Sequence, residues 1–336
     1  MAYAAVADTN TIITTHASVI MILFFRELIM FASSMAFAKF SQWIRSGRES
    51  TPPLSCLDFT AISRQIRKGN MKRIKLTVAY DGTDYCGWQI QKNGVTVEEV
   101  LNRALSRLTG EKITVVGASR TDAGVHAQGN VAVFDTDTRI PAERIAYAVN
   151  ALLPEDVVVV RSEEVPAGWH PRKCVSVKTY EYRILNREFP DPVRRRDTYF
   201  VSFPLDLDRM RRAAEYLKGT HDFKSFCSAQ TTVEDTVRTI YSLDVDRERE
   251  LFTIRVRGNG FLYNMVRIIA GTLAGVGRGY FEPGDVERML AEKDRTKAGV
   301  TAPPQGLTLV GIEYEDTAQD GGCNNKGNDQ GKCCSS

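Results

Sequence analysis

The sequence predicts an α+β protein made of two tandem ferredoxin-like halves, joined into one mixed or antiparallel sheet with a central cleft. Between Met71 and Tyr314, segments with the alternating pattern of strands take turns with segments at helical spacing. The order β-α-β-β-α-β occurs once before residue 170 and again after it, as in ferredoxin-like units. Apolar residues make up 43% and charged residues 25% of the chain, which is ordinary for a globular protein.

The first half contains every element of one such unit. We expect strands at residues 73–80, 112–118, 130–136 and 156–165, and helices at 95–108 and 141–153. Thr96 can act as the N-cap of the first helix, because its hydroxyl can accept a bond from a free backbone N–H. Pro141 suits the first turn of the second helix.

The second half repeats the order. We expect strands at residues 177–185, 237–248, 250–258 and 307–314, and helices at 206–219, 261–277 and 283–293. The strands at 237–248 and 250–258 are close enough in sequence to form a hairpin. A cleft between two such halves is a usual place for a ligand.

We expect four parts in the chain: an extension at 1–70, halves at 71–170 and 171–315, and a tail at 316–336. The extension has two apolar runs, and both are shorter than the roughly 20 residues of a membrane-spanning helix. Met71 opens a new pattern, so our hypothesis is a mis-started chain whose first 70 residues are extra or disordered. A weak amphipathic membrane or targeting segment is the alternative. The tail lacks apolar residues and is expected to be disordered.

One loop places an unusual set of side chains between two strands. In "GASRTDAGVHAQGNVAVF", residues 117–134, the loop carries Arg120 and Asp122, with His126 close behind. A glycosidase would need a second carboxylate, and the next one, Asp135, lies beyond the following strand. The chain has four His at no ligand spacing, no C-x-x-C pair and no phosphate-binding Gly-rich loop, so we expect no metal or other cofactor. Asp122 is then either a nucleophile or base, or an ordinary loop Asp bonded to its own backbone.

This stretch resembles the catalytic motif of the bacterial tRNA pseudouridine synthase A family. Further resemblances follow in family order in "AYDGTDYCGWQIQ", "WHPRKCVSVKTYEYRI", "HDFKSFCSA", "GNGFLYNMVRIIAGTL" and "DRTKAGVTAPPQGLTLV". Pro171 replaces the family's usual Ala in the second of these. The resemblance covers residues 71–314 and implies the pseudouridine synthase fold.

The resemblance implies that uridines at positions 38, 39 and 40 of the tRNA anticodon arm are isomerised without a cofactor. Asp122 matches the essential aspartate, which would act as nucleophile at C1′ or remove a proton from C2′. Arg267 would pair with Asp122, and Arg120 would assist base flipping or hold the backbone. Tyr180 would stack on the flipped base, whereas Tyr182 is expected to be structural.

RNA binding needs positive charge on the protein surface. Lys and Arg nearly balance Asp and Glu over residues 71–315, so any such charge must be local. We expect Arg172 and Lys178 to bind substrate, with the run 194–196 as a further candidate. His126 and His170 are expected to be hydrogen-bonded scaffold.

The resemblance also implies a homodimer that binds tRNA in the cytoplasm, without a membrane. A different function is open: a catalytically inactive tRNA-binding or chaperone module with the same fold.

Overall fold

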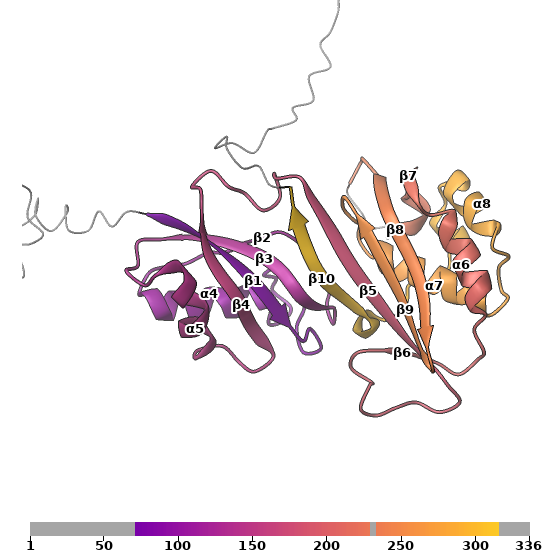
Figure 1. Cartoon of the computed structure of the whole chain (residues 1–336), viewed down its shortest axis with the longest axis horizontal. Helices are drawn as coiled ribbons and strands as arrows, with labels where there is room; N and C mark the ends of the chain where they lie inside the picture. The colour runs from indigo at the N-terminus through magenta and orange to yellow at the C-terminus, as the bar shows by residue number, and fades with distance from the viewer. Residues whose placement is uncertain (1–70, 229–232, 316–336) are drawn as a thin grey trace, which may run out of the picture. The chain divides into compact units, whose positions relative to one another are not determined.

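The computed structural model describes residues 71–228 and 233–315, and ten strands in these ranges form one sheet (Figure 1). Its order is β4-β1-β3-β10-β5-β9-β8-β7, with β2 beside β3 and β6 beside β5. The β3–β10 and β5–β6 pairs are parallel and the others antiparallel, so the sheet is mixed, as the sequence predicts. Our expectations for 1–70 and 316–336 lie outside the described residues.

The first half has the strand order β4-β1-β3-β2. Its two α-helices overlap the segments predicted to be helical, and the second is shorter than expected. Its elements are β1 (Lys72–Tyr80), α4 (Val97–Thr109), β2 (Val116–Gly117), β3 (His126–Thr136), α5 (Ile145–Asn150) and β4 (Val157–Val165). Thr96 is the N-cap of α4, and its hydroxyl accepts the backbone N–H of Glu99 at 3.4 Å.

The second half has the equivalent order β10-β5-β9-β8, extended by β7. Its elements are β5 (Ser176–Asn186), β6 (Tyr199–Val201), α6 (Leu207–Glu215), β7 (Gly219–Asp222), β8 (Val237–Glu248), β9 (Leu251–Gly258), α7 (Met265–Gly277), α8 (Asp285–Glu292) and β10 (Leu307–Tyr314). In Figure 1, yellow β10 lies between β3 and β5, so the last strand of the chain joins the two halves.

Two predicted elements are shorter than expected. Only Val116 and Gly117 of the segment 112–118 pair as a strand, because side chains of α4 take the preceding N–H groups. The N–H of Ile113 donates to Ser106 Oγ at 2.9 Å, and that of Val115 to Asn102 Oδ1 at 2.8 Å. The helix expected at 141–153 is a 3-10 turn at Ala142–Arg144 followed by the six residues of α5.

Helix α7 lies almost entirely within the core of the second half. Every one of its residues except Arg267 is buried, so this guanidinium is the exception on an apolar helix. Gly271 allows the chain at residues 299–302 to lie directly against α7, since a Cβ there would be 1.9 Å from Val300 O. This close approach brings Ala302 to Arg267, and the Ala302 N–H donates to Arg267 O at 3.1 Å.

The loop between β2 and β3 emerges where the halves meet. On one edge of β3, Ala132 and Val133 pair with β2, whereas His126 and Ala127 pair with β10. Residues 118–125 leave the sheet between these two partners. The seam therefore places Asp122 beside elements of the second half.

Candidate active site

A cavity of about 830 Å³ lies at this seam and is lined by both halves. The first half contributes the loop at Ala118–Ala123 and Val125, together with Cys86, Gln89, Ile90, Gln91 and Asn93. The other lining residues are Arg172, Lys178, Tyr180, Val233, Arg238, Phe261–Val266 and Leu307. Of the site residues predicted from the sequence, Arg267 contacts the cavity through Asp122 and the run 194–196 does not line it, whereas all the others do.

The backbone of the segment at 82–88 supports the loop. Gly87 has a φ of 81°, and a Cβ there would lie 2.5 Å from Thr121 O, so this position needs glycine. The N–H of Trp88 donates to the same Thr121 oxygen at 3.1 Å, and that of Gly124 to Tyr85 O at 3.3 Å. These bonds fix the loop on both sides of Asp122.

Asp122 and Arg267 meet across the seam. Arg267 Nη1 lies 3.5 Å from Asp122 Oδ2, and both side chains are at most one-fifth exposed. The guanidinium is held by two further acceptors, since Nε donates to Ala302 O at 2.8 Å and Nη1 to Asn264 Oδ1 at 2.7 Å. Asn264 is neutral, so it orients the guanidinium of Arg267 without competing with Asp122 as a counter-ion.

Burial and charge act on Asp122 in opposite directions. Desolvation raises the pKa of its carboxyl above the ordinary value, and the charge and hydrogen bond of Arg267 lower it. The net effect is a raised pKa, so the ionised form is a destabilised, reactive anion. This is the state expected of a nucleophile or base.

Tyr180 on β5 forms another wall of the cavity. Its hydroxyl lies 3.0 Å from Ser119 Oγ, and its ring meets that of Phe261 edge-on at 5.2 Å between centroids. Burial raises the pKa of Tyr180 to about 12, so the phenol is neutral at physiological pH. Tyr182, two residues on, is buried elsewhere and donates its hydroxyl proton to Pro303 O at 2.7 Å.

The cations predicted for RNA binding fall into two groups. Arg120, Arg172 and Lys178 line the cavity, and Arg120 is exposed at its surface. Among the described residues no carboxylate lies within 4 Å of Arg120. Arg196 of the run 194–196 does not line the cavity; it lies 3.8 Å from Asp81 Oδ2. Three residues of the site were not predicted from the sequence: Ser119, Asn264 and Arg238. The first two lie within the quoted motifs, close to Arg120 and Arg267, whereas Arg238 lies outside every motif.

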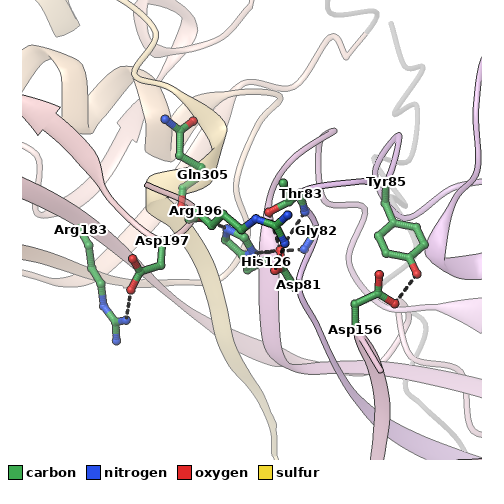
Figure 2. A network of polar contacts seen from close by, with 10 residues as sticks. All are labelled: Asp81, Gly82, Thr83, Tyr85, His126, Asp156, Arg183, Arg196, Asp197 and Gln305. Carbon is green, nitrogen blue, oxygen red and sulfur yellow. Dashed lines mark hydrogen bonds and ion pairs between the residues drawn. The ribbon is translucent and has the colours of Figure 1, made fainter. Parts of the chain in front are cut away.

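His126 ties three segments to the end of the loop (Figure 2). Its Nε2 lies 2.8 Å from Arg196 O and 3.1 Å from Gln305 O. Because both neighbours are carbonyl oxygens, Nε2 must carry a proton and donate. Nδ1 accepts the Gly82 N–H at 3.1 Å and lies 3.1 Å from Asp81 Oδ1. These contacts fit the predicted scaffold role.

We expect His126→Ala to lower the free energy of unfolding by about 1–3 kcal/mol, because it leaves buried backbone groups without a partner. His126→Gln should recover part of this loss, since the amide can donate where Nε2 does. Urea unfolding measures the difference. His170→Ala is the control, since that half-buried ring accepts one hydrogen bond, from the Arg172 N–H at 3.1 Å. Unchanged stability of His126→Ala would show that the ring does not hold these segments together.

Two further observations concern the described ranges. No group of three His, Cys, Asp or Glu side chains in residues 71–228 and 233–315 is arranged to hold a metal ion. Every helix in the same ranges is too short or too polar to span a bilayer.

Comparison with known proteins identifies the family. The family model described as tRNA pseudouridine synthase matches residues 76–172 and 213–315. A protein of Thermoanaerobacter sp. (strain X514) named tRNA pseudouridine synthase A is 49% identical over 244 residues, which cover 73% of this chain and 100% of that protein. A protein of the same name from Brevibacillus brevis is 50% identical over 244 residues, with the same coverage.

A solved structure titled as a Cbf5-Nop10-Gar1 complex aligns with 70% of this chain and 47% of that chain. Its sequence identity is 12% and its TM-score 0.28. The family therefore rests on the sequence matches. The family model covers Asp122 and Arg267, whereas Tyr180 lies between its two matched segments. The chain belongs to the tRNA pseudouridine synthase A family.

Proposed function

We propose that this protein is an isomerase that converts uridine to pseudouridine in tRNA, at positions 38, 39 and 40 of the anticodon stem-loop. The observation that carries the proposal is the pair of Asp122 and Arg267 at the seam of the two halves, 3.5 Å apart and largely buried. The names of relatives with about half of their residues identical support the activity.

The reaction moves the uracil without losing any atom of the nucleotide. The N1–C1′ bond breaks, the base turns, and C5 bonds to C1′; the proton on C5 is lost and N1 gains one. Asp122 can attack C1′ and leave when C5 attacks the same carbon, or it can remove and return the C2′ proton. Both routes need the ionised carboxylate, which Arg267 favours.

The target base must leave its stack to reach Asp122, which costs a few kcal/mol. We propose that Tyr180 stacks on the flipped base, because its neutral ring lines the cavity. Exposed Arg120 fits a role at the vacated space or on the flanking backbone. Arg172 and Lys178 supply positive charge for the RNA.

The alternative is an inactive tRNA-binding module of the same fold. A module that only binds RNA gains nothing from a buried carboxylate with a raised pKa facing a polyanion. The Asp122–Arg267 pair thus favours the enzyme. The two functions separate experimentally, since an inactive module would not depend on Asp122.

Release of the C5 hydrogen provides the test. Unmodified tRNA transcribed with uridine tritiated at C5 should lose tritium to water when the protein is added, because C5 exchanges its hydrogen for the bond to C1′. Tritium retained by every tRNA tested, with tRNA binding intact, would favour the binding module.

We further propose that the enzyme acts as a cytoplasmic homodimer, with halves at 71–170 and 171–315. A chain that begins at Met71 is expected to match the full chain in turnover and melting temperature. The whole length of the relatives aligns with 244 residues of this chain, which supports this expectation. Activity assays and light scattering on both lengths provide the check. Loss of folding in the shorter chain would assign residues 1–70 a structural role.

A further inference from the structure

Three cations gather in the cavity wall with little negative charge to balance them. Arg172 precedes β5, Lys178 lies on β5, and Arg238 reaches the cavity from β8. In residues 71–228 and 233–315, no carboxylate lies within 4 Å of Arg172 or Lys178. Arg238 has one distant partner, the exposed Asp235, at 3.9 Å. Glu98 favours the charged form of Arg172 only from farther away.

The backbone holds each cation by part of its donor set. Arg172 Nε donates to Gly117 O at 2.7 Å, and Lys178 Nζ lies 3.5 Å from Ala118 O. Arg238 uses Nη1 alone, toward the Asp235 and Val237 carbonyls. The outer nitrogens of Arg172, two protons of Lys178 and the Nη2 of Arg238 are therefore available for a ligand.

The cations repel one another enough to affect ionisation. Burial first, and then the charges of Arg172 and Arg238, lower the pKa of Lys178 to about 8. Arg120 in turn disfavours the charge of Arg172. Partly buried like charges without a counter-ion are unfavourable, and a bound anion would relieve both the repulsion and the desolvation.

We propose that Arg172, Lys178 and Arg238 form a binding site for a single phosphodiester group of the RNA, next to the target nucleotide. This site rests on the proposed function, because RNA is the anion that would enter the cavity. Arg forks and a Lys ammonium suit the oxygens of one phosphate. All three cations belong to the second half, and carbonyls of the first half hold Arg172 and Lys178, so the phosphate would lie beside the seam.

The site would also position the catalytic loop. Gly117 and Ala118, whose carbonyls hold Arg172 and Lys178, directly precede Ser119 and the loop residues up to Asp122. A phosphate that fixes these two cations fixes the start of the loop. Binding of the RNA phosphate and orientation of Asp122 are thus linked through the short stretch of chain from Ala118 to Asp122.

The test measures affinity for an anticodon stem-loop RNA by fluorescence anisotropy. Arg238→Gln should weaken binding about tenfold or more and lower the salt slope of log Kd by about 0.7–0.9, as expected for one lost phosphate contact. Lys178→Met is the second variant. Arg247→Gln is the matched control, since Arg247 lies on the same strand, is exposed and does not line the cavity. Thermal melting establishes that each variant is folded.

Substitution of the RNA phosphates identifies the partner of the site. Methylphosphonate, which is uncharged, replaces one phosphate at a time around the target uridine. When the methylphosphonate replaces the phosphate that the site binds, Arg238→Gln and Lys178→Met should cause no further loss of affinity, because the group they contact is already neutral. If the protein and RNA substitutions lower affinity additively at every phosphate, or if the salt slope of Arg238→Gln is unchanged, these cations do not form a phosphate site.

Failure of the site and failure of the proposed function can be told apart. The affinity measurements with protein variants and methylphosphonate RNAs need no turnover, so they test the phosphate site even if the protein makes no pseudouridine. Tritium release by the unaltered protein, together with additive effects at all phosphates, would leave the function standing and remove the site.

Discussion

Asp122→Asn is expected to lower pseudouridine formation by on the order of 10⁴-fold or more, as for removal of other essential catalytic groups. The amide can neither attack C1′ nor accept a proton from C2′. Affinity for tRNA should stay within about tenfold, or about 1.4 kcal/mol, because the carboxylate does not bind the polyanion. Single-turnover assays and anisotropy measure the two effects separately.

The same substitution should leave the protein as stable or make it more stable at neutral pH. The folded-state pKa of Asp122 is raised, so the native state binds this proton more tightly than the unfolded state. Stability therefore falls as pH rises through the interval from the ordinary pKa of 3.8 to the raised value. Asparagine cannot ionise and so removes this loss of stability. At pH values above that interval, the melting temperature of Asp122→Asn should therefore not be lower than that of the unaltered protein.

Asp84→Asn is the matched control, since Asp84 is an exposed carboxylate within the supporting segment at 82–88 and does not line the cavity. It should keep full turnover. Turnover by Asp122→Asn near that of the unaltered protein, with deamidation excluded by intact mass, would remove Asp122 from the reaction.

Arg267→Lys is expected to lower turnover by roughly 10- to 150-fold while the protein stays folded. Lysine keeps the charge but cannot contact Ala302 O, Asn264 Oδ1 and Asp122 Oδ2 from a planar fork. Loss of a charged hydrogen bond of about 1.5–3 kcal/mol corresponds to this range of rates. Turnover assays beside thermal melts measure the effect.

The pH profile distinguishes a role at Asp122 from a general loss of packing. Arg267→Met removes the charge that lowers the pKa of Asp122, so the acidic limb of activity should move to higher pH. Arg278→Lys, just beyond the end of α7, is the control and should keep the original limb. An unmoved limb in Arg267→Met, or full turnover in Arg267→Lys, would show that another group sets the ionisation of Asp122.

Long periodic elements could be predicted from the sequence, whereas short ones could not. The strand at 307–314 matches β10, and the hairpin at 237–258 matches β8 and β9 within one residue. Strands β6 and β7 were missed because three or four residues cannot show an alternating pattern. The segment 112–115 has the pattern of a strand, but Ser106 and Asn102 take its N–H groups.

The site divides in the same way. Arg267 was visible because a guanidinium on an apolar helix needs an anion, and the resemblance named Asp122 as that anion. Arg238 was not visible, since a lone Arg at the start of a strand has no distinguishing pattern, and only the folded arrangement of the strands brings the start of β8 to the cavity. Contacts made through the backbone, such as Arg172 to Gly117 O, also leave no trace in residue type.

The most direct test is to incubate the purified protein with unmodified tRNA and to analyse its nucleosides by chromatography against a pseudouridine standard. Reverse transcription after carbodiimide treatment then maps each modified position. We expect pseudouridine at positions 38, 39 or 40 with the unaltered protein and none with Asp122→Asn. Uridine left unchanged in every tRNA, or equal pseudouridine from both proteins, would contradict this expectation.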